Sequence, residues 1–244
     1  MLMELKPFIT LFINSNHMSR LFRLLPALTL SIVVIACSPS DDKNSTQKEI
    51  TKKTANYWHD TSTYSPEGLV HALIEIPAGS DKKYELNKNT GIIEWETLDN
   101  GEKRRINHLP YPANYGMIPQ TYLSPDTGGD GDPLDIILLG PAIKRGSIVP
   151  CRLIGGLQLT DNGEQDDKLI AIPAEGTFSE LENLPQLDIL YPGVTEIIRI
   201  WFSNYKGEGK LQSEGFFSKA EALKILSLSS DMYKNTFQPK TENK

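Results

Sequence analysis

Short apolar segments separated by turn residues fill the middle of this chain. Four of them are apolar enough to form buried strands: Leu69–Ile76, Ile136–Leu139, Ser147–Leu159 and Leu169–Pro173. A β-hairpin is predicted as well, since Lys83–Leu86 and Ile92–Glu96 flank the turn-forming residues Asn87–Gly91. Turn signals recur about every eight to twelve residues, a spacing typical of a β-sandwich or a β-barrel.

Two helices are predicted toward the C-terminus. Within Val194–Tyr205 the apolar residues fall at i, i+3, i+4, i+7, i+8 and i+11, which is one face of an amphipathic helix, and Gly207 would end it. Ser218 and Glu221 have the spacing of a capping box, so a second helix is predicted to begin at Ser218. We find no internal repeat and no second domain. The prediction is one α+β domain that is mainly β, with peripheral helices.

The N-terminal region has the features of an export signal. Leu21–Ala36 is an almost uninterrupted apolar run beside the basic residue Arg20, and its roughly 16 residues are fewer than the ~20 that a spanning helix needs. Its end, Val34–Cys37, resembles a bacterial lipobox, in which the cysteine is lipidated and becomes the new N-terminus. The alternative is a buried helix with an ordinary thiol at Cys37, but the polar residues Ser38–Asp42 that follow favour the signal.

These features divide the chain into four predicted segments. Residues 1–36 form the signal peptide, within which Met18 is an alternative start, and residues 37–56 form a flexible tether rich in Ser, Thr, Asp and Lys. Residues 57–235 form the folded domain, and residues 236–244 a C-terminal tail. Lipidation at Cys37 predicts a protein anchored in the bacterial cell envelope on the periplasmic side, with the outer membrane as one destination.

Charge and cysteine content exclude several classes of protein. The chain has 25 Lys and Arg against 31 Asp and Glu, a net charge of −6, which gives it no general attraction for nucleic acid or anionic lipid. Its two cysteines, Cys37 and Cys151, are too few for a disulfide scaffold or a zinc-ribbon cluster. An acidic chain is better suited to binding cations.

The most informative segment is an acidic loop directly before a predicted buried strand. Asp130, Asp132 and Asp135 fall within six residues, which also contain Gly131 and Pro133. Gly129 directly precedes this segment, and the apolar run Ile136–Leu139 directly follows it. Carboxylates this close repel one another by about 1 kcal/mol or more per pair at the dielectric of a protein surface. Such a cluster is tolerated when it is solvated or when hard cations neutralise it, and its place at a strand edge favours the second alternative.

A calcium loop of the EF-hand type is excluded. Such a loop needs glycine at its sixth position and glutamate at its twelfth, and these positions hold Asp135 and Pro141. A second acidic group follows further along the chain and ends at Lys168; its members are Asp161, Glu164, Asp166 and Asp167. Alone this group would be a polar hairpin, but beside the first it would complete an all-oxygen site for several divalent ions, magnesium rather than zinc.

Further charged and phenolic residues would suit a dense anion such as a polyphosphate beside these metals. They are Glu75, Lys83, Glu85, Arg104, Arg105, Tyr111, Tyr115, Tyr205 and Lys206. Each of them alone is more simply explained as a surface charge or a core tyrosine. Only the whole set makes a functional interpretation as plausible as this structural one.

At this point the sequence resembles the family I soluble inorganic pyrophosphatases. Asp130–Asp135 fits the family signature Asp-x-Asp-Pro-hydrophobic-Asp. Five further motifs occur in the family's order: Glu75-Ile76-Pro77, Lys83-Tyr84-Glu85, Tyr111-Pro112-Ala113-Asn114-Tyr115-Gly116, Asp161 with Asp166-Asp167-Lys168, and Tyr205-Lys206. The resemblance covers roughly Leu69 to Lys206 and extends to the C-terminal helix.

The resemblance implies a fold, a reaction and partners. The fold would be a distorted five-stranded β-barrel of OB type with helices alongside, and residues 57–235 would be an inorganic pyrophosphatase domain. The reaction would be Mg²⁺-dependent hydrolysis of pyrophosphate to two phosphates by a metal-activated water, with several Mg²⁺ ions per site. The expected partners are pyrophosphate, the membrane through the lipid on Cys37, and further copies of the chain in a homo-oligomer, without nucleic acid.

The resemblance also implies roles for individual residues. Asp130, Asp135 and Asp166 would hold the first metal ion, and Asp161 and Glu75 would help to bind the others. Asp132 would be the general base. The expected phosphate ligands are Lys83, Arg105, Tyr115, Tyr205 and Lys206, and the expected supporting residues are Glu85, Lys168 and Tyr111. Arg104 is an alternative to Arg105, because the spacing from the arginine to Tyr111 is shorter than in the bacterial pattern.

The export signal departs from the family, which we associate with the cytosol. Two other functions therefore stay open at this stage. One is a phosphohydrolase of the same chemistry that acts on other phosphoanhydrides. The other is a non-catalytic lipoprotein that binds cations or phosphate; the presence of every expected carboxylate counts against it.

Overall fold

The computed structural model describes residues 55–238. The predicted signal peptide (1–36), Cys37, most of the predicted tether and residues 239–244 of the predicted tail lie outside the described residues. Within 55–238, no helix is both long enough and apolar enough to cross a membrane.

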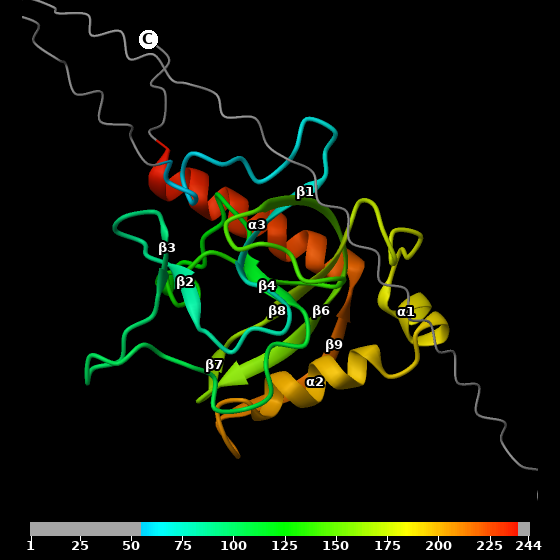
Figure 1. The fold of residues 1–244 in the computed structure, drawn as a ribbon. Helices are drawn as coiled ribbons and strands as arrows, with labels where there is room; N and C mark the ends of the chain where they lie inside the picture. Colours follow the sequence, from blue (N-terminus) through cyan, green and yellow to red (C-terminus); the bar gives the residue numbers. More distant parts are fainter. Residues whose placement is uncertain (1–54, 239–244) are drawn as a thin grey trace, which may run out of the picture. The chain divides into compact units, whose positions relative to one another are not determined.

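Five strands of the main sheet pair in a closed ring (Figure 1). Strand β1 (Val70–Ile76) is antiparallel to β4 (Asn114–Met117), which is antiparallel to β5 (Asp135–Leu138). Strand β5 is parallel to β8 (Lys168–Pro173), and β8 is antiparallel to the long strand β6 (Ile148–Asp161). The antiparallel pairing of β6 with β1 completes the ring. This is the mainly β, OB-like arrangement that we expected.

Other strands extend this ring or lie beside it. Strands β7 (Glu164–Gln165) and β9 (Leu211–Ser218) both pair with β6. The predicted hairpin is present as a separate two-stranded sheet of β2 (Tyr84–Leu86) and β3 (Ile93–Trp95). The four strands predicted from apolar runs are β1, β5, β6 and β8, each with bounds close to those expected.

Strand β4 was not predicted, because its four residues Asn114–Met117 show no apolar alternation. Its glycine explains how it fits into the sheet. A Cβ at Gly116 would lie 1.8 Å from the carbonyl oxygen of Leu73, so only a residue without a side chain lets the backbones of β4 and β1 approach as they do. The pairing that closes the sheet here depends on a missing side chain, which a search for apolar periodicity does not detect.

Both predicted helices are present. Helix α2 (Val194–Asn204) packs Ile198, Trp201 and Phe202 into the core. Helix α3 (Lys219–Phe237) begins as expected, because the Ser218 hydroxyl accepts a hydrogen bond from the backbone N–H of Glu221. Helix α3 continues two residues past the boundary placed at residue 235. The short helix α1 (Leu184–Leu190) and the 3₁₀ turn η1 (Pro125–Thr127) were not predicted.

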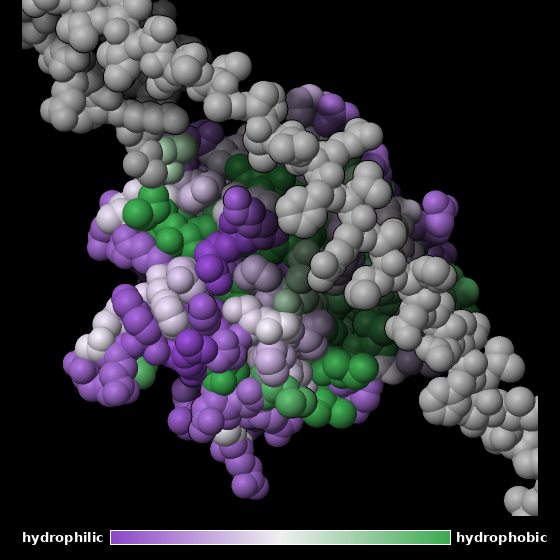
Figure 2. Space-filling view, in the orientation of Figure 1, coloured by the Kyte–Doolittle hydropathy of each residue, from purple (hydrophilic) through white to green (hydrophobic). Residues whose placement is uncertain are grey.

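The surface divides by character (Figure 2). Hydrophilic residues gather around the β2–β3 hairpin and the β7 end of the sheet, whereas hydrophobic residues lie over α2. Ile197 and Ile200 of α2 are among the exposed large hydrophobic residues.

Candidate active site

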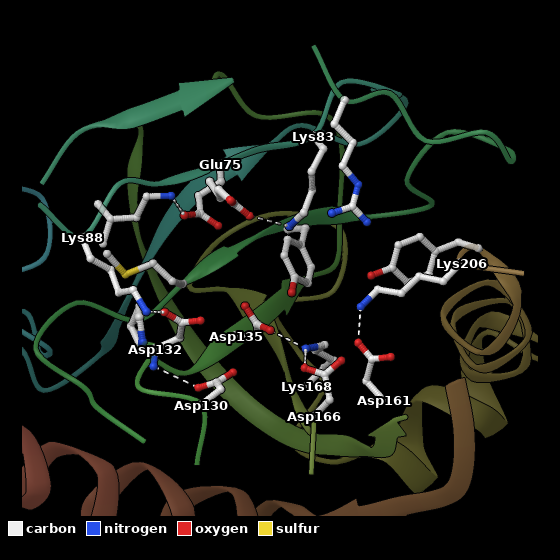
Figure 3. A pocket seen from close by; sticks show the side chains of 17 residues that line it. Glu75, Lys83, Lys88, Asp130, Asp132, Asp135, Asp161, Asp166, Lys168 and Lys206 are labelled. Carbon is white, nitrogen blue, oxygen red and sulfur yellow. Dashed lines mark hydrogen bonds and ion pairs between the residues drawn. The ribbon is translucent and has the colours of Figure 1, made fainter. Parts of the chain in front are cut away.

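A cavity of about 410 Å³ is lined by acidic, basic and phenolic side chains from widely separated segments (Figure 3). Its acidic residues are Glu75, Glu85, Asp130, Asp132, Asp135, Asp161 and Asp166. Its basic residues are Lys83, Lys88, Arg104, Lys168 and Lys206. Leu86, Tyr115, Met117, Pro133 and Tyr205 complete the wall. The two acidic groups that are more than twenty residues apart in the sequence therefore face one shared space.

The parallel pairing of β5 with β8 explains this convergence. Ile136 of β5 lies opposite Leu169 of β8, so the residues before them, Asp135 and Lys168, begin their strands at the same edge of the sheet. Asp161 ends β6, and the turn to β7 brings the chain back to Asp166, whose backbone N–H donates to Leu159. The turn thus returns Asp166 to the edge where β5 begins.

Lys168 lies between two carboxylates at the centre of the cavity. It is 3% exposed, and its Nζ pairs with Asp135 and, at 2.5 Å, with Asp166. Burial alone would lower the pKa of Lys168, but the two carboxylates raise it well above its usual value. Burial alone would raise the pKa of Asp135, but the charge of Lys168 brings it below its usual value. The ammonium and the Asp135 carboxylate therefore keep each other ionised.

A further carboxylate in the cavity is that of Glu75, which lies on β1. It is 4% exposed, and its Oε1 accepts a 2.7 Å hydrogen bond from the backbone N–H of Leu86 in the hairpin. Burial raises the pKa of Glu75 to about 8, and the nearby Lys83 opposes that shift. The Lys83 ammonium lies 3.4 Å from Glu85, which follows it two residues later.

The loop before β5 presents Asp130 and Asp132. The backbone N–H of Asp132 donates to the Asp130 carboxylate at 2.9 Å, and Lys88 Nζ lies 2.5 Å from the Asp132 carboxylate. Gly131 adopts φ +79°, a left-handed conformation that favours glycine. Burial raises the pKa of Asp130, and the charge of Asp132 adds to that shift. The tight loop holds two carboxylates side by side at the cavity wall.

The end of α2 supplies the opposite wall. Tyr205 stacks on Trp201 one turn earlier, with ring centroids 4.7 Å apart and planes 7° from parallel, and Lys206 pairs with Asp161. Tyr115 of β4 lies beneath the Lys83 ammonium, 5.4 Å from its ring centroid. Burial raises the pKa of both tyrosines well above the usual value, so both phenols stay protonated and can donate hydrogen bonds.

A family model described as inorganic pyrophosphatase matches residues 72–234, about two thirds of the chain. The chain belongs to the inorganic pyrophosphatase family. This membership confirms the resemblance to the family I enzymes and the expected enzyme class, inorganic diphosphatase.

Individual family members are similar over most of the folded domain. An inorganic pyrophosphatase of Ralstonia nicotianae is 36% identical over 138 residues, which cover 56% of this chain and 73% of that protein. A soluble inorganic pyrophosphatase of Oryza sativa is 33% identical over 187 residues, which cover 73% and 79%. The crystal structure of the type I inorganic pyrophosphatase from Toxoplasma gondii superposes with a TM-score of 0.69 at 28% identity, covering 74% of this chain and 88% of that one.

The structure places the two candidate arginines differently. Arg104 lines the cavity, whereas Arg105 lines an adjoining cavity of about 340 Å³. That second cavity shares Arg104, Asp161, Tyr205 and Lys206 with the first. The Arg105 side chain is paired with Asp81 at 2.6 Å and lies over the Trp95 ring. Arg104 is held at the cavity wall by Glu96, 2.8 Å from its Nη1. The physical reason is that neighbouring residues of an extended segment point to opposite sides, so an uncertainty of one residue exchanges the two side chains.

The other expected residues fall into two groups. Tyr111 lies in the core beneath the cavity, 2% exposed and 5.4 Å from the Tyr115 ring, where it supports that phenol. Glu164 and Asp167 of the second acidic group do not line the cavity either: Glu164 is exposed in β7, and Asp167 accepts a hydrogen bond from the backbone N–H of Leu159. The other candidates in the described residues line it, apart from Arg105. Lys88 and Met117 line it too and were not predicted. Met117 shares a face of β4 with Tyr115, two residues away, and Lys88 was hidden as an ordinary turn residue of the predicted hairpin.

The donor chemistry of the cavity fits hard divalent cations. Its acidic residues offer carboxylate oxygens, the ligands that Mg²⁺ and similar ions prefer. Within residues 55–238, no three Asp, Glu, His or Cys side chains are gathered closely enough to hold one ion in the present arrangement. Lys168, Lys206 and Lys88 neutralise the carboxylates instead.

Replacing Lys168 by methionine should destabilise the metal-free protein at pH 8 by up to about 3–5 kcal/mol, because two carboxylates with only 29% and 21% of their side chains exposed would lose their counter-charge. In the wild type, Lys168 lowers the pKa of Asp135, so the stability it contributes is lost as the pH falls through that pKa. In the variant the pKa rises, and the native state gains stability as the pH falls. The difference in free energy of unfolding should therefore shrink between pH 8 and pH 5.

Urea unfolding in EDTA at both pH values measures this difference. Lys224→Met is the matched control, because Lys224 lies on α3 with 66% of its side chain exposed and should contribute almost nothing. A destabilisation by Lys168→Met that is equal at pH 8 and pH 5 would contradict the assignment.

Proposed function

We propose that this chain hydrolyses inorganic pyrophosphate to two phosphate ions and uses Mg²⁺ bound by the carboxylates of the cavity. The observation that carries the proposal is the convergence of Asp130, Asp132, Asp135, Asp161 and Asp166 with lysines and an arginine in one cavity of a pyrophosphatase-family domain. Carboxylates can hold the metal, and the cations can hold a substrate that is itself densely anionic.

In this proposal Asp130, Asp135 and Asp166 hold the first metal ion, and Asp161 and Glu75 contribute to binding further ions. Bound Mg²⁺ would lower the pKa of water toward neutrality and offset charge on the phosphates. Lys168 keeps Asp135 ionised and so ready to act as a ligand.

Asp132 is proposed as the general base. Its side chain is 47% exposed at the cavity wall, and its carboxylate oxygen lies 2.5 Å from the Nζ atom of Lys88. The loop places it between Asp130 and Asp135, so it can orient a water that attacks phosphorus beside them. Transfer of the water proton to Asp132 would produce the nucleophile as the new P–O bond forms and the bond to the bridging oxygen breaks.

The cationic and phenolic wall is proposed to hold the phosphate groups. Lys83, Arg104 and Lys206 supply charge for the phosphate oxygens, and the phenols of Tyr115 and Tyr205 supply neutral donors. Donors that are already in place before charge develops on the departing phosphate stabilise the transition state more than they stabilise the substrate.

We also propose that the protein is exported and anchored to the bacterial cell envelope by a lipid on Cys37, facing the periplasm. The lipobox-like sequence Val34–Cys37 and the polar stretch after it support this part. The protein would then act on pyrophosphate outside the cytosol. Self-association into a homo-oligomer, expected from the resemblance, is also part of the proposal.

Asp132→Asn should retain the fold and lose at least about 100-fold in the rate of phosphate release from pyrophosphate with Mg²⁺, because the amide cannot accept the proton. Asp126→Asn is the matched control, since Asp126 lies in the same loop within η1 but does not line the cavity. Near wild-type turnover of Asp132→Asn would exclude the proposed role. Tripolyphosphate and nucleoside triphosphates tested beside pyrophosphate separate the proposed activity from a broader phosphohydrolase, and binding without phosphate release would indicate a non-catalytic protein.

Arg104→Ala should lower kcat/KM for pyrophosphate by about 10- to 100-fold, the effect of losing a hydrogen bond to a charged group. Arg105→Ala should change it by less than about threefold, because the Arg105 guanidinium lines the adjoining cavity and is already paired with Asp81 at an exposed position. Steady-state kinetics of the two variants, with unfolding measured in parallel, decides between the neighbouring arginines. The reverse order of effects would assign the phosphate contact to Arg105.

The full chain expressed in a bacterium should partition into the detergent phase of Triton X-114, because a lipidated N-terminus adds a large apolar surface. Cys37→Ala removes the acceptor for the lipid but keeps the apolar run Leu21–Ala36 on the chain, so partitioning alone does not distinguish the two proteins. An alkyne fatty acid fed to the cells should label the wild type and not Cys37→Ala, and phosphate release should be equal in both. Absence of label in the wild type, or equal label in the variant, would refute lipid anchoring at Cys37 and leave the catalytic proposal unaffected.

A further inference from the structure

The acidic loop, residues 118–134, connects the end of β4 to the start of β5, and hydrogen bonds join its two ends to each other. After β4, the backbone N–H of Ile118 donates to Leu134 at 2.9 Å, and the Thr121 hydroxyl accepts from the backbone N–H of Leu134 at 2.9 Å. These bonds fix the two ends of the loop. Asp130 and Asp132 lie between them, so their positions depend on contacts within the loop and on Lys88 of the hairpin, whose Nζ lies 2.5 Å from the Asp132 carboxylate and 3.3 Å from the Gly131 carbonyl oxygen.

The backbone of Leu123 forms hydrogen bonds with the segment that carries the acidic residues. Its N–H donates to the carbonyl of Asp132 at 2.9 Å, and its carbonyl accepts from the N–H of Gly131 at 2.8 Å. Gly129 allows this close approach, because a Cβ there would lie 2.6 Å from the backbone of Leu123. The segment that carries Asp130 and Asp132 therefore follows any movement of Leu123.

Helix α3 binds Tyr122, the residue directly before Leu123. Ser229 is 1% exposed, and its hydroxyl bonds to both polar groups of Tyr122, accepting from the N–H at 2.9 Å and donating to the carbonyl at 3.0 Å. The carbonyl of Ser229 also accepts from the Tyr122 N–H at 3.1 Å. Ser229 does not line the cavity. Its hydrogen bonds reach the acidic loop through Tyr122, which directly precedes Leu123.

We propose that Ser229 is a positioning residue for the proposed reaction: its hydroxyl sets the place of the acidic loop and thereby of Asp130 and Asp132. This inference rests on the proposed function for its catalytic consequence. In Ser229→Ala the Tyr122 carbonyl would lose its donor, while the backbone bond from Tyr122 to Ser229 would remain. The loop would be loosened rather than released.

A cavity beside Ser229 leaves room for the acidic loop to move. A cavity of about 180 Å³ lies between α3 and the loop, lined among others by Leu123, Gly129, Leu134 and Ser229. Gln165 and Asp167, on either side of Asp166, line the same cavity. The packing between α3 and both acidic segments is therefore incomplete at this point, and directional hydrogen bonds rather than close packing hold the loop in register.

Hydrogen exchange of the metal-free protein tests the inference without any activity. Ser229→Ala should speed amide exchange in residues 122–134 by about fivefold or more, because the bonds that protect this segment weaken. Ser230→Ala is the matched control, since Ser230 is 5% exposed on the same helix but lines a different cavity, next to Thr63 and Tyr233. Equal exchange in the two variants, or no change in Ser229→Ala, would overturn the inference.

The kinetic readout separates positioning from general stability. Ser229→Ala should raise the Mg²⁺ concentration for half-maximal pyrophosphate hydrolysis by about tenfold, as expected when an outer contact of a ligand segment is lost, and Ser230→Ala should not. Ser229→Thr and Ser229→Val have the same shape and differ in the hydroxyl, so Thr should retain wild-type behaviour and Val should not. Identical behaviour of Thr and Val would overturn the role of the hydroxyl.

The two proposals fail separately. A wild-type protein that releases no phosphate from pyrophosphate would exclude the proposed function, while the exchange rates would still decide whether Ser229 positions the loop. An active wild type with unchanged exchange in Ser229→Ala and Ser229→Val would exclude the positioning role alone.

Discussion

The Lys168 ammonium is the charge on which the rest of the site depends. Two buried carboxylates that face one another cannot both ionise without a counter-charge, and Lys168 supplies it to Asp135 and Asp166. Because Asp135 begins β5 and Lys168 begins β8, this ion pair lies where two parallel strands of the ring start. The same contact joins the acidic loop to the later acidic hairpin, so the topology of the sheet and the ionisation of the ligands are fixed together.

The metal-free cavity is neutralised from within by its own lysines. Lys88 pairs with Asp132, Lys206 with Asp161, and Lys83 lies beside Glu85. A hard cation that bound these carboxylates would compete with the ammonium groups for the same oxygens. The displaced lysines would then be available to an anion in the same cavity. If the cavity binds metal and phosphate as proposed, binding of one would therefore favour binding of the other, since each would relieve a charge that the other leaves uncompensated.

The parts of this fold that could be predicted are those in which local pattern and tertiary environment agree. The Ser218 cap belongs to α3 and the apolar face of Val194–Tyr205 to α2. Each depends on residues of a single helix, so the sequence is sufficient to locate both. Strand β4 could not be found, because its place depends on the close approach of Leu73 to Gly116. The neighbouring Arg104 and Arg105 could not be separated either, since which one faces the cavity depends on the pairing of an extended segment. Motif order located the acidic residues, but their common cavity is a property of the ring.

The C-terminal helix shows why the functional unit is larger than the set of residues that line the cavity. Helix α3 contributes no side chain to the cavity wall among the described residues, yet Ser229 holds Tyr122, and Leu123 beside it holds the backbone of Asp132. The family model extends to residue 234, well past the last cavity residue, Lys206. A loop rich in glycine and aspartate has little apolar surface with which to fix itself, so its geometry must be imposed from outside. A helix that offers a buried hydroxyl at one fixed point is a rigid way to impose it.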